Sequence, residues 1–100
     1  MKLFHGTTAQ AAEEIVASGF LRGPVFLTAR RDVAEDYAGY GEVIVVHVAD
    51  GDLMVDLDMP GARLLSVADA AAYLGEDSAT NIEWFIERGY SVGVTGDIEL

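Results

Sequence analysis

Apolar residues along the chain switch between two spacings, one typical of strands and the other of helices. The strongest strand signal is the β-branched run at residues 42–48, because valine and isoleucine pack well on a pleated sheet. Shorter apolar runs bounded by turn residues predict further strands. These are expected at residues 2–5, 25–28, 53–57, 91–95 and 98–100.

Four helices are predicted where apolar residues at helical spacing follow a residue that can cap a helix N-terminus. Two of the starts fit the capping-box pattern, in which a hydroxyl residue is followed three positions later by glutamine or glutamate. Glycine is the expected stop, because it adopts the left-handed conformation without strain. The predicted helices begin near Thr7-Thr8-Ala9-Gln10, Thr28, Ser66 and Thr80-Asn81-Ile82-Glu83, and end near Gly19, Tyr40, Gly75 and Gly89.

The connections between these elements bear on the fold class. Asp50-Gly51-Asp52 has turn composition, and we expect it to fold residues 53–57 back on the strand at 42–48 as a hairpin. Met59-Pro60-Gly61 is expected to be a loop. Strands and helices do not alternate regularly, so the sequence predicts one α+β domain over residues 1–100, not a doubly wound parallel sheet.

Composition restricts the chemistry and the environment. Half of the 100 residues are apolar, which is enough for one core. The chain has no cysteine, which excludes disulfides, thiolate metal sites and a cysteine nucleophile. No apolar run is long enough to span a bilayer, and residues 1–4 lead directly into His5-Gly6 without the apolar segment of a signal peptide. We therefore expect a soluble, cytoplasmic protein without a membrane partner.

The charge balance is the most unusual bulk property. Seventeen acidic residues oppose six basic ones, which gives a net charge of −11. Direct binding to nucleic acid is disfavoured, since phosphates are bound by clustered basic side chains. One interpretation is solubility alone. Another is that the acidic surface docks on a basic partner, such as a nucleic-acid-binding protein, or mimics its nucleic acid.

The first candidate for chemistry is His5, at the end of the first predicted strand. Gly6 follows it and either allows close approach to the backbone or permits a turn with positive φ. A histidine there, beside the hydroxyl of Thr7, could hold a polar ring ligand. Taken alone, the segment fits better a structural histidine that is hydrogen-bonded ahead of a capped helix.

Several segments together resemble the ADP-ribosyltransferase superfamily, in the histidine-type branch that includes poly-ADP-ribose polymerases and diphtheria-like toxins. Leu3-Phe4-His5-Gly6-Thr7 resembles the first-strand motif of that family, and residues 15–20 resemble the end of its next helix. Val25-Phe26-Leu27-Thr28 and Ala34-Glu35-Asp36-Tyr37-Ala38 resemble the second motif, and residues 89–94 the approach to the last catalytic strand. The resemblance implies a small split, mostly antiparallel sheet with flanking helices and an NAD+ cleft.

The resemblance also implies roles for individual residues. His5 would hydrogen-bond the nicotinamide ribose, and the backbone of Gly6 would hold the carboxamide. Thr7 would support the loop, and Tyr37 would stack on the nicotinamide ring. Phe26 stands where the family usually has a tyrosine, so an aromatic wall is kept and a hydroxyl is lost.

The third family position is an acidic or amide residue on a late strand. It stabilises the positive charge that develops on the ribose when the glycosidic bond breaks. Glu99 and Asp97 are the two candidates in this chain, and Glu83 is a weaker one. The sequence does not choose between Glu99 and Asp97.

The implied function is transfer of ADP-ribose from NAD+, the substrate, to a macromolecular acceptor, most simply a protein with a basic surface. Very small acidic domains with these motifs also resemble phage-encoded anti-CRISPR proteins of the ADP-ribosyltransferase type, which act on CRISPR effector complexes. The alternative is an inactive acidic binding protein, either an inhibitor or a nucleic-acid mimic, on the same fold. RNA 2′-phosphotransferases share the His-Gly-Thr element, but six basic residues are few for their phosphate chemistry.

Two further features carry less functional meaning. His47 lies in the β-branched run and fits an ordinary strand residue. Asp50, Asp52, Asp56 and Asp58 look like a calcium cluster but lack the spacing and late glutamate of an EF-hand. We therefore expect no metal site.

Overall fold

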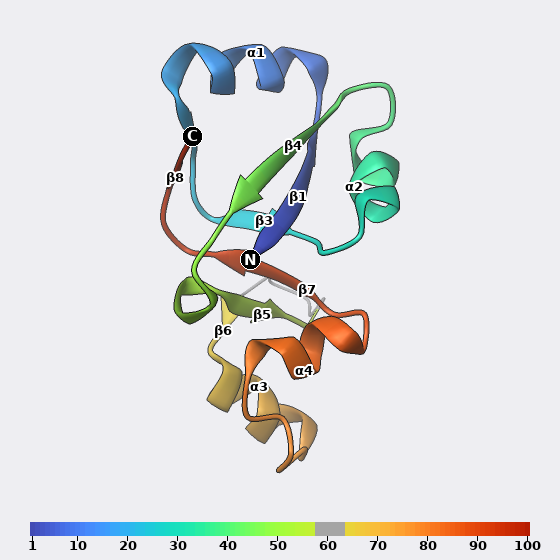
Figure 1. The fold of residues 1–100 in the computed structure, drawn as a ribbon, viewed down its shortest axis with the longest axis vertical. Helices are drawn as coiled ribbons and strands as arrows, with labels where there is room; N and C mark the ends of the chain where they lie inside the picture. Colours follow the sequence, from blue (N-terminus) through green and yellow to red (C-terminus); the bar gives the residue numbers. More distant parts are fainter. Residues whose placement is uncertain (58–63) are drawn as a thin grey trace.

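The computed structural model describes residues 1–57 and 64–100 of the chain. The loop expected at Met59-Pro60-Gly61 and the side chain of Asp58 lie outside the described residues. The described chain has an α+β structure with antiparallel sheets and four α-helices (Figure 1), as the sequence predicts at this coarse level. It measures 42 × 25 × 23 Å along its principal axes.

The N-terminal strand β1 (Lys2–Thr7) pairs with β4 (Glu42–His47) in antiparallel register, with His5 opposite Ile44. Leu3 and Val46, also opposite each other, are buried, so this pair contributes to the core through one face. The long β-branched run therefore forms a strand as predicted, and its partner is the strand that carries His5.

A second sheet has four strands in the order β3-β7-β5-β6, all antiparallel. On its two central strands, Val55 and Val92 face each other without exposure to solvent. A separate two-stranded sheet joins β2 to β8. The bounds are β2 (Phe20–Leu21), β3 (Val25–Leu27), β5 (Met54–Asp56), β6 (Leu64–Leu65), β7 (Ser91–Val94) and β8 (Ile98–Glu99).

A short bridge connects the β1–β4 pair to the four-stranded sheet. The amide of Phe4 donates to the carbonyl of Thr28 at 2.8 Å, and the amide of Thr28 donates back to the carbonyl of Phe4 at 3.0 Å. Thr28 immediately follows β3, so this bridge joins β1 to the end of β3, and the two strands diverge away from it.

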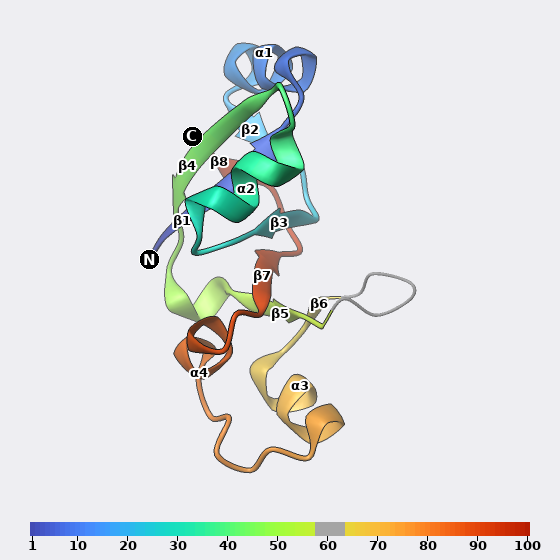
Figure 2. The same ribbon diagram turned by 90° about the vertical axis from the view of Figure 1, so that its right-hand side faces the viewer.

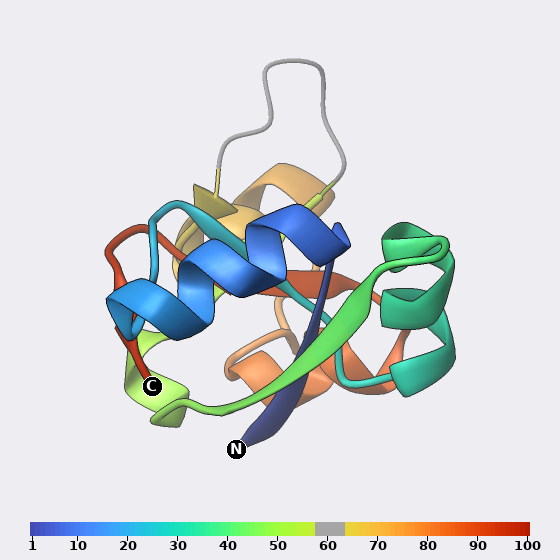
Figure 3. The same cartoon turned by 90° about the horizontal axis from the view of Figure 1, so that it is seen from above.

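The helices lie around these sheets. In Figures 1 and 2, α2 lies beside the β1–β4 pair, α1 covers one end of the molecule, and α3 and α4 lie at the other. Figure 3, seen from above, shows α1 and α2 on different sides of that strand pair. Their bounds are α1 (Ala9–Ser18), α2 (Arg31–Ala38), α3 (Val67–Leu74) and α4 (Ile82–Glu87). None of the helices in the described ranges combines the length and apolarity needed to cross a bilayer.

The helix ends agree only in part with the sequence prediction. Ser66 caps α3 as predicted, and Gly19 and Gly75 end α1 and α3 in the left-handed conformation. The predicted threonine starts were wrong by one or more residues. The N-caps of α1 and α4 are Thr8 and Asn81, each of which accepts a hydrogen bond from the amide three residues later.

Thr28 does not cap α2, which begins after Arg30. The hydroxyl of Thr28 instead accepts from the amide of Arg30 at 3.1 Å, because the backbone of Thr28 is already held in the bridge to Phe4. The second predicted helix therefore starts later than the sequence indicated and ends at Ala38, before Tyr40.

The predicted hairpin between residues 42–48 and 53–57 was wrong. A 3-10 turn at Asp50–Asp52 separates the two strands, β4 pairs with β1, and β5 lies between β6 and β7. Burial of Val55 accounts for the difference, since a strand with partners on both sides excludes more solvent than one arm of a hairpin. The two-residue strands β2 and β6 were not predicted.

Candidate functional site

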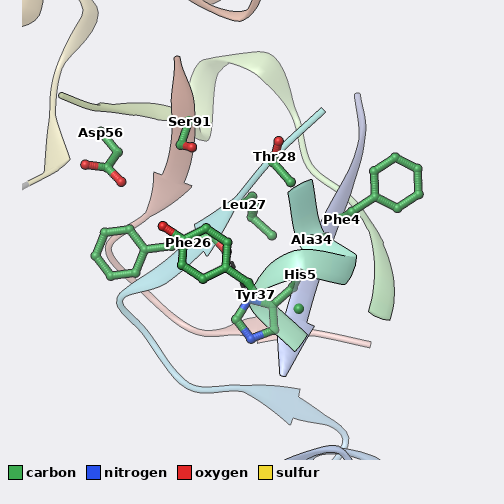
Figure 4. Close-up of a pocket in the computed structure, with 10 residues that line it drawn as sticks. Phe4, His5, Phe26, Leu27, Thr28, Ala34, Tyr37, Asp56 and Ser91 are labelled. Atoms are coloured by element: carbon green, nitrogen blue, oxygen red, sulfur yellow. Dashed lines mark hydrogen bonds between the residues drawn. The ribbon is translucent and has the colours of Figure 1, made fainter. Parts of the chain in front are cut away.

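A cavity of about 350 Å³ lies where β1 and β3 diverge, with α2 along one side and β5 and β7 on another (Figure 4). This volume is at the lower end of the range for small-molecule sites. Its walls come from segments far apart in the sequence. The lining residues are Phe4, His5, Gly6, Phe26, Leu27, Thr28, Ala34, Tyr37, Asp56 and Ser91.

Gly6 allows α2 to lie directly on the backbone of β1. A Cβ at position 6 would be 2.1 Å from the carbonyl oxygen of Ala34 and 3.0 Å from the amide nitrogen of Ala38. The sequence left two explanations for Gly6, close approach to the backbone or a turn with positive φ. Gly6 does not have a positive φ, so the structure supports close approach. The group that approaches is the helix backbone, and this contact brings the residues of α2 next to His5.

The ring of His5 has a defined partner on one side. Its Nδ1 is 2.9 Å from the carbonyl oxygen of Phe26. A carbonyl only accepts, so Nδ1 carries the hydrogen and Nε2 of the neutral ring remains an acceptor. The side chain is half-buried and lines the cavity. His5 can therefore offer a hydrogen-bond acceptor of fixed orientation to a hydroxyl group.

Two aromatic residues border the cavity from different elements. Tyr37 comes from the last turn of α2, and Phe26 from the middle of β3 (Figure 4). The side chain of Tyr37 is 79% exposed, whereas Ala34, one turn earlier, is buried against β1. Tyr37 therefore lies at the mouth of the cavity, where a flat ring ligand could stack against it.

The wall made by β5 and β7 carries Asp56 and Ser91, which are paired in the antiparallel register (Figure 4). Sequence reasoning placed Asp56 only in a possible calcium cluster, and it included Ser91 in the resembling segment 89–94 without giving it a role in the site. Alternation along β5 indicates the face of the strand, because buried Val55 directs the side chain of Asp56 to the opposite face, but it does not indicate which strand lies beside it. Among the described residues that line this cavity, Asp56 is the one carboxylate.

The two late acidic candidates lie elsewhere. Glu99 is in β8 opposite Phe20 of β2, and Asp97 is in the turn before it. Both border a different hollow, which also includes His47. The structure thus brings His5, Gly6, Phe26 and Tyr37 together, and leaves Asp97 and Glu99 outside that group.

The remaining predicted residues, Thr7 and Glu83, belong to neither of these two groups. Thr7 ends β1, and its carbonyl is so close to Gly41 that a Cβ there would lie 2.0 Å from the oxygen. It is not among the residues that line the cavity, and it supports the turn after α2 by backbone packing. Glu83 lies in the first turn of α4, beside a third hollow.

Asp97 has a local role that its surroundings explain. Its carboxylate accepts from the amide of Gly23 at 2.7 Å and from the guanidinium of Arg22 at 3.0 Å. The backbone hydrogen bond from Gly23, followed by the side chain of Arg22, lowers the pKa of Asp97 below its usual 3.8. The carboxylate therefore joins the loop before β3 to the turn before β8.

We expect Asp97→Ala to lower the melting temperature at neutral pH. Because the pKa is lowered in the folded state, the contribution is present above the unfolded pKa and is lost as the pH falls through the folded pKa, below 3.8. Thermal melts of wild type and variant should therefore differ at pH 7 and converge as the pH is lowered below 3.8 and through the folded-state pKa. Glu14→Ala, on the exposed face of α1, is the control and should leave the melting temperature unchanged. A gap that stays constant with pH would contradict this account.

Comparison with models of protein families, with curated proteins and with solved structures found no match for the chain. Within residues 1–57 and 64–100, no group of three or more histidine, aspartate or glutamate side chains is arranged to hold a metal ion. The case for a function therefore rests on the cavity and on the residues around it.

Proposed function

We propose that the chain is a small ADP-ribosyltransferase that binds NAD+ in the cavity between β1, β3 and α2 and transfers ADP-ribose to a protein. The observation that carries the proposal is the gathering of His5, Gly6, Phe26 and Tyr37 around one cavity. These residues come from the separate segments in which the sequence resembles the family. In this proposal the divergence of β1 from β3 is the split of an ADP-ribosyltransferase-like sheet, and the cavity is its NAD+ cleft.

Binding would use the geometry of each wall. Nicotinamide would lie at the mouth, with its ring against Tyr37 and with Phe26 nearby as an apolar wall. The free Nε2 of His5 would accept a hydrogen bond from a ribose hydroxyl, since Nδ1 is occupied by the carbonyl of Phe26. The backbone of Gly6 would hold the carboxamide. A cavity of about 350 Å³ would enclose the nicotinamide ribose and leave the adenosine end of NAD+ outside.

Asp56 would supply the negative charge that the reaction requires. When the bond between C1′ and the nicotinamide nitrogen breaks, nicotinamide leaves with the electron pair and positive charge develops on the ribose. A carboxylate already in place near this charge stabilises the transition state. Asp56 lies in the cavity wall, unlike Asp97 and Glu99, and so is the better candidate. The acceptor then forms a bond to C1′ and loses its proton.

The proposal is tested by turnover. Purified protein is incubated with NAD+ labelled on the adenylate and with cell lysate, and labelled acceptor is counted per molecule of protein. We expect the label to exceed one per molecule and to depend on His5, so that His5→Ala gives none. The inactive acidic binder, which the net charge of −11 also fits, predicts the opposite. Its effect on a target would saturate near equimolar protein and would not depend on NAD+.

Tyr37→Ala should weaken binding of NAD+ roughly two- to tenfold, because stacking on an aromatic ring contributes about 0.5–1.5 kcal/mol. Tyr37→Phe should bind as the wild type does, since the ring and not the hydroxyl is used. Isothermal titration calorimetry measures both. Tyr73, an exposed tyrosine on α3, provides the matched control, and Tyr73→Ala should have no effect. Equal affinities for all four proteins would remove Tyr37 from the site.

A further inference from the structure

The end of α2 presents two tyrosine rings to solvent beside the mouth of the cavity. Tyr37 is 79% exposed and Tyr40 is 108% exposed. α2 ends at Ala38, Gly39 turns the chain with a φ of 60°, and Gly41 packs closely against the backbone of Thr7. Packing of Gly41 fixes the turn, so Tyr40 is held away from the body of the molecule instead of folding onto it.

The charged residues within the segment 35–42 are all acidic. Residues 35–42 read Glu-Asp-Tyr-Ala-Gly-Tyr-Gly-Glu and contain no basic residue. Asp36 and Glu42 are exposed, whereas Glu35 is already paired with Arg31 at 3.1 Å. Two rings with open faces, flanked by two exposed carboxylates, are complementary to a group that is both flat and positively charged.

We propose that residues 35–42, the acidic–aromatic rim, dock an arginine-bearing segment of the acceptor protein. A guanidinium group stacks on an aromatic face and pairs with a carboxylate in the same contact, which the compact ammonium of lysine does less well. The identification of the docked segment as part of an acceptor rests on the proposed function. Because Tyr37 belongs both to the rim and to the cavity lining, a segment held on Tyr40 lies next to the position of the ribose.

The binding step is tested without NAD+, by fluorescence anisotropy with a labelled hexa-arginine peptide. We expect hexa-arginine to bind more tightly than hexa-lysine and hexa-glutamate not to bind. The double variant Tyr40→Ala, Asp36→Asn should weaken hexa-arginine binding about fivefold or more, through loss of a cation–π contact and of a charge. Tyr40→Phe should retain the wild-type affinity, since it keeps the ring.

The matched control is Tyr73→Ala, Asp77→Asn, which makes the same changes at an exposed tyrosine and an exposed aspartate of the distant α3 end. It should bind hexa-arginine as the wild type does. An equal loss of hexa-arginine affinity in both double variants would mean that the peptide is attracted by the acidic protein in general. That result would overturn docking at the acidic–aromatic rim. Absence of peptide binding would overturn it too, while NAD+ binding in the calorimetric test would still support the proposed function.

Discussion

Gly6→Ala is expected to lower the free energy of unfolding by about 3 kcal/mol or more, at the upper end of the range for overpacking. The added Cβ would lie 2.1 Å from the carbonyl oxygen of Ala34. That oxygen belongs to the helix backbone and cannot turn aside as a flexible side chain would. Relief requires α2 to move away from β1, which also separates Tyr37 from His5. Denaturant unfolding measures the loss, and NAD+ binding should disappear with it.

Gly51→Ala is the control for this prediction. A Cβ at Gly51 would have no heavy atom within 4 Å, and its φ is not positive. Its stability should therefore stay within about 0.5 kcal/mol of the wild type, as for most surface substitutions. If the two variants were equally stable, the contact between α2 and β1 would be looser than the geometry requires.

Asp56→Asn is expected to reduce kcat about 100-fold or more, the scale of removing one group that stabilises transition-state charge. Asparagine keeps the shape of aspartate and removes its charge. Because positive charge develops on the ribose only as nicotinamide leaves, KM should change little. Steady-state release of nicotinamide measures both quantities once turnover has been established.

The effect of Asp56→Asn is compared with a surface control and with variants of the two late carboxylates. Asp69→Asn, exposed at the start of α3, should turn over as the wild type does. Glu99→Gln and Asp97→Asn test the two carboxylates that the sequence favoured. If one of these slowed turnover and Asp56→Asn did not, the catalytic charge would belong to the β8 region.

Local sequence patterns were sufficient for most of the elements. Strands rich in β-branched residues and helix ends marked by Ser66, Gly19 and Gly75 follow from preferences that act within a few residues. The strands β2 and β6 are too short, at two residues each, to show any periodicity. They are defined by tertiary pairing, since β2 pairs with the equally short β8 and β6 pairs with the edge of β5.

Some residues of the candidate site could likewise be predicted from local sequence, and one could not. His5, Gly6, Phe26 and Tyr37 could be grouped from sequence because recognisable motifs contain them. Asp56 could not, since its place depends on β5 pairing with β7, across a sequence separation that local patterns do not encode. The error about the hairpin and the omission of Asp56 have one cause. A strand placed against β4 would have carried that side chain elsewhere.

The backbone bridge between Phe4 and Thr28 couples the stability of the fold to ligand binding in the cavity. Its two hydrogen bonds join the strand that carries His5 to the strand that carries Phe26. A ligand that contacts both strands adds further interactions across this bridge. Its binding stabilises the folded state by RT ln(1 + [L]/Kd). If NAD+ is that ligand, as we propose, a high concentration of NAD+ would stabilise the contact between the two strands by mass action, and depletion of NAD+ would make the protein easier to unfold and to degrade.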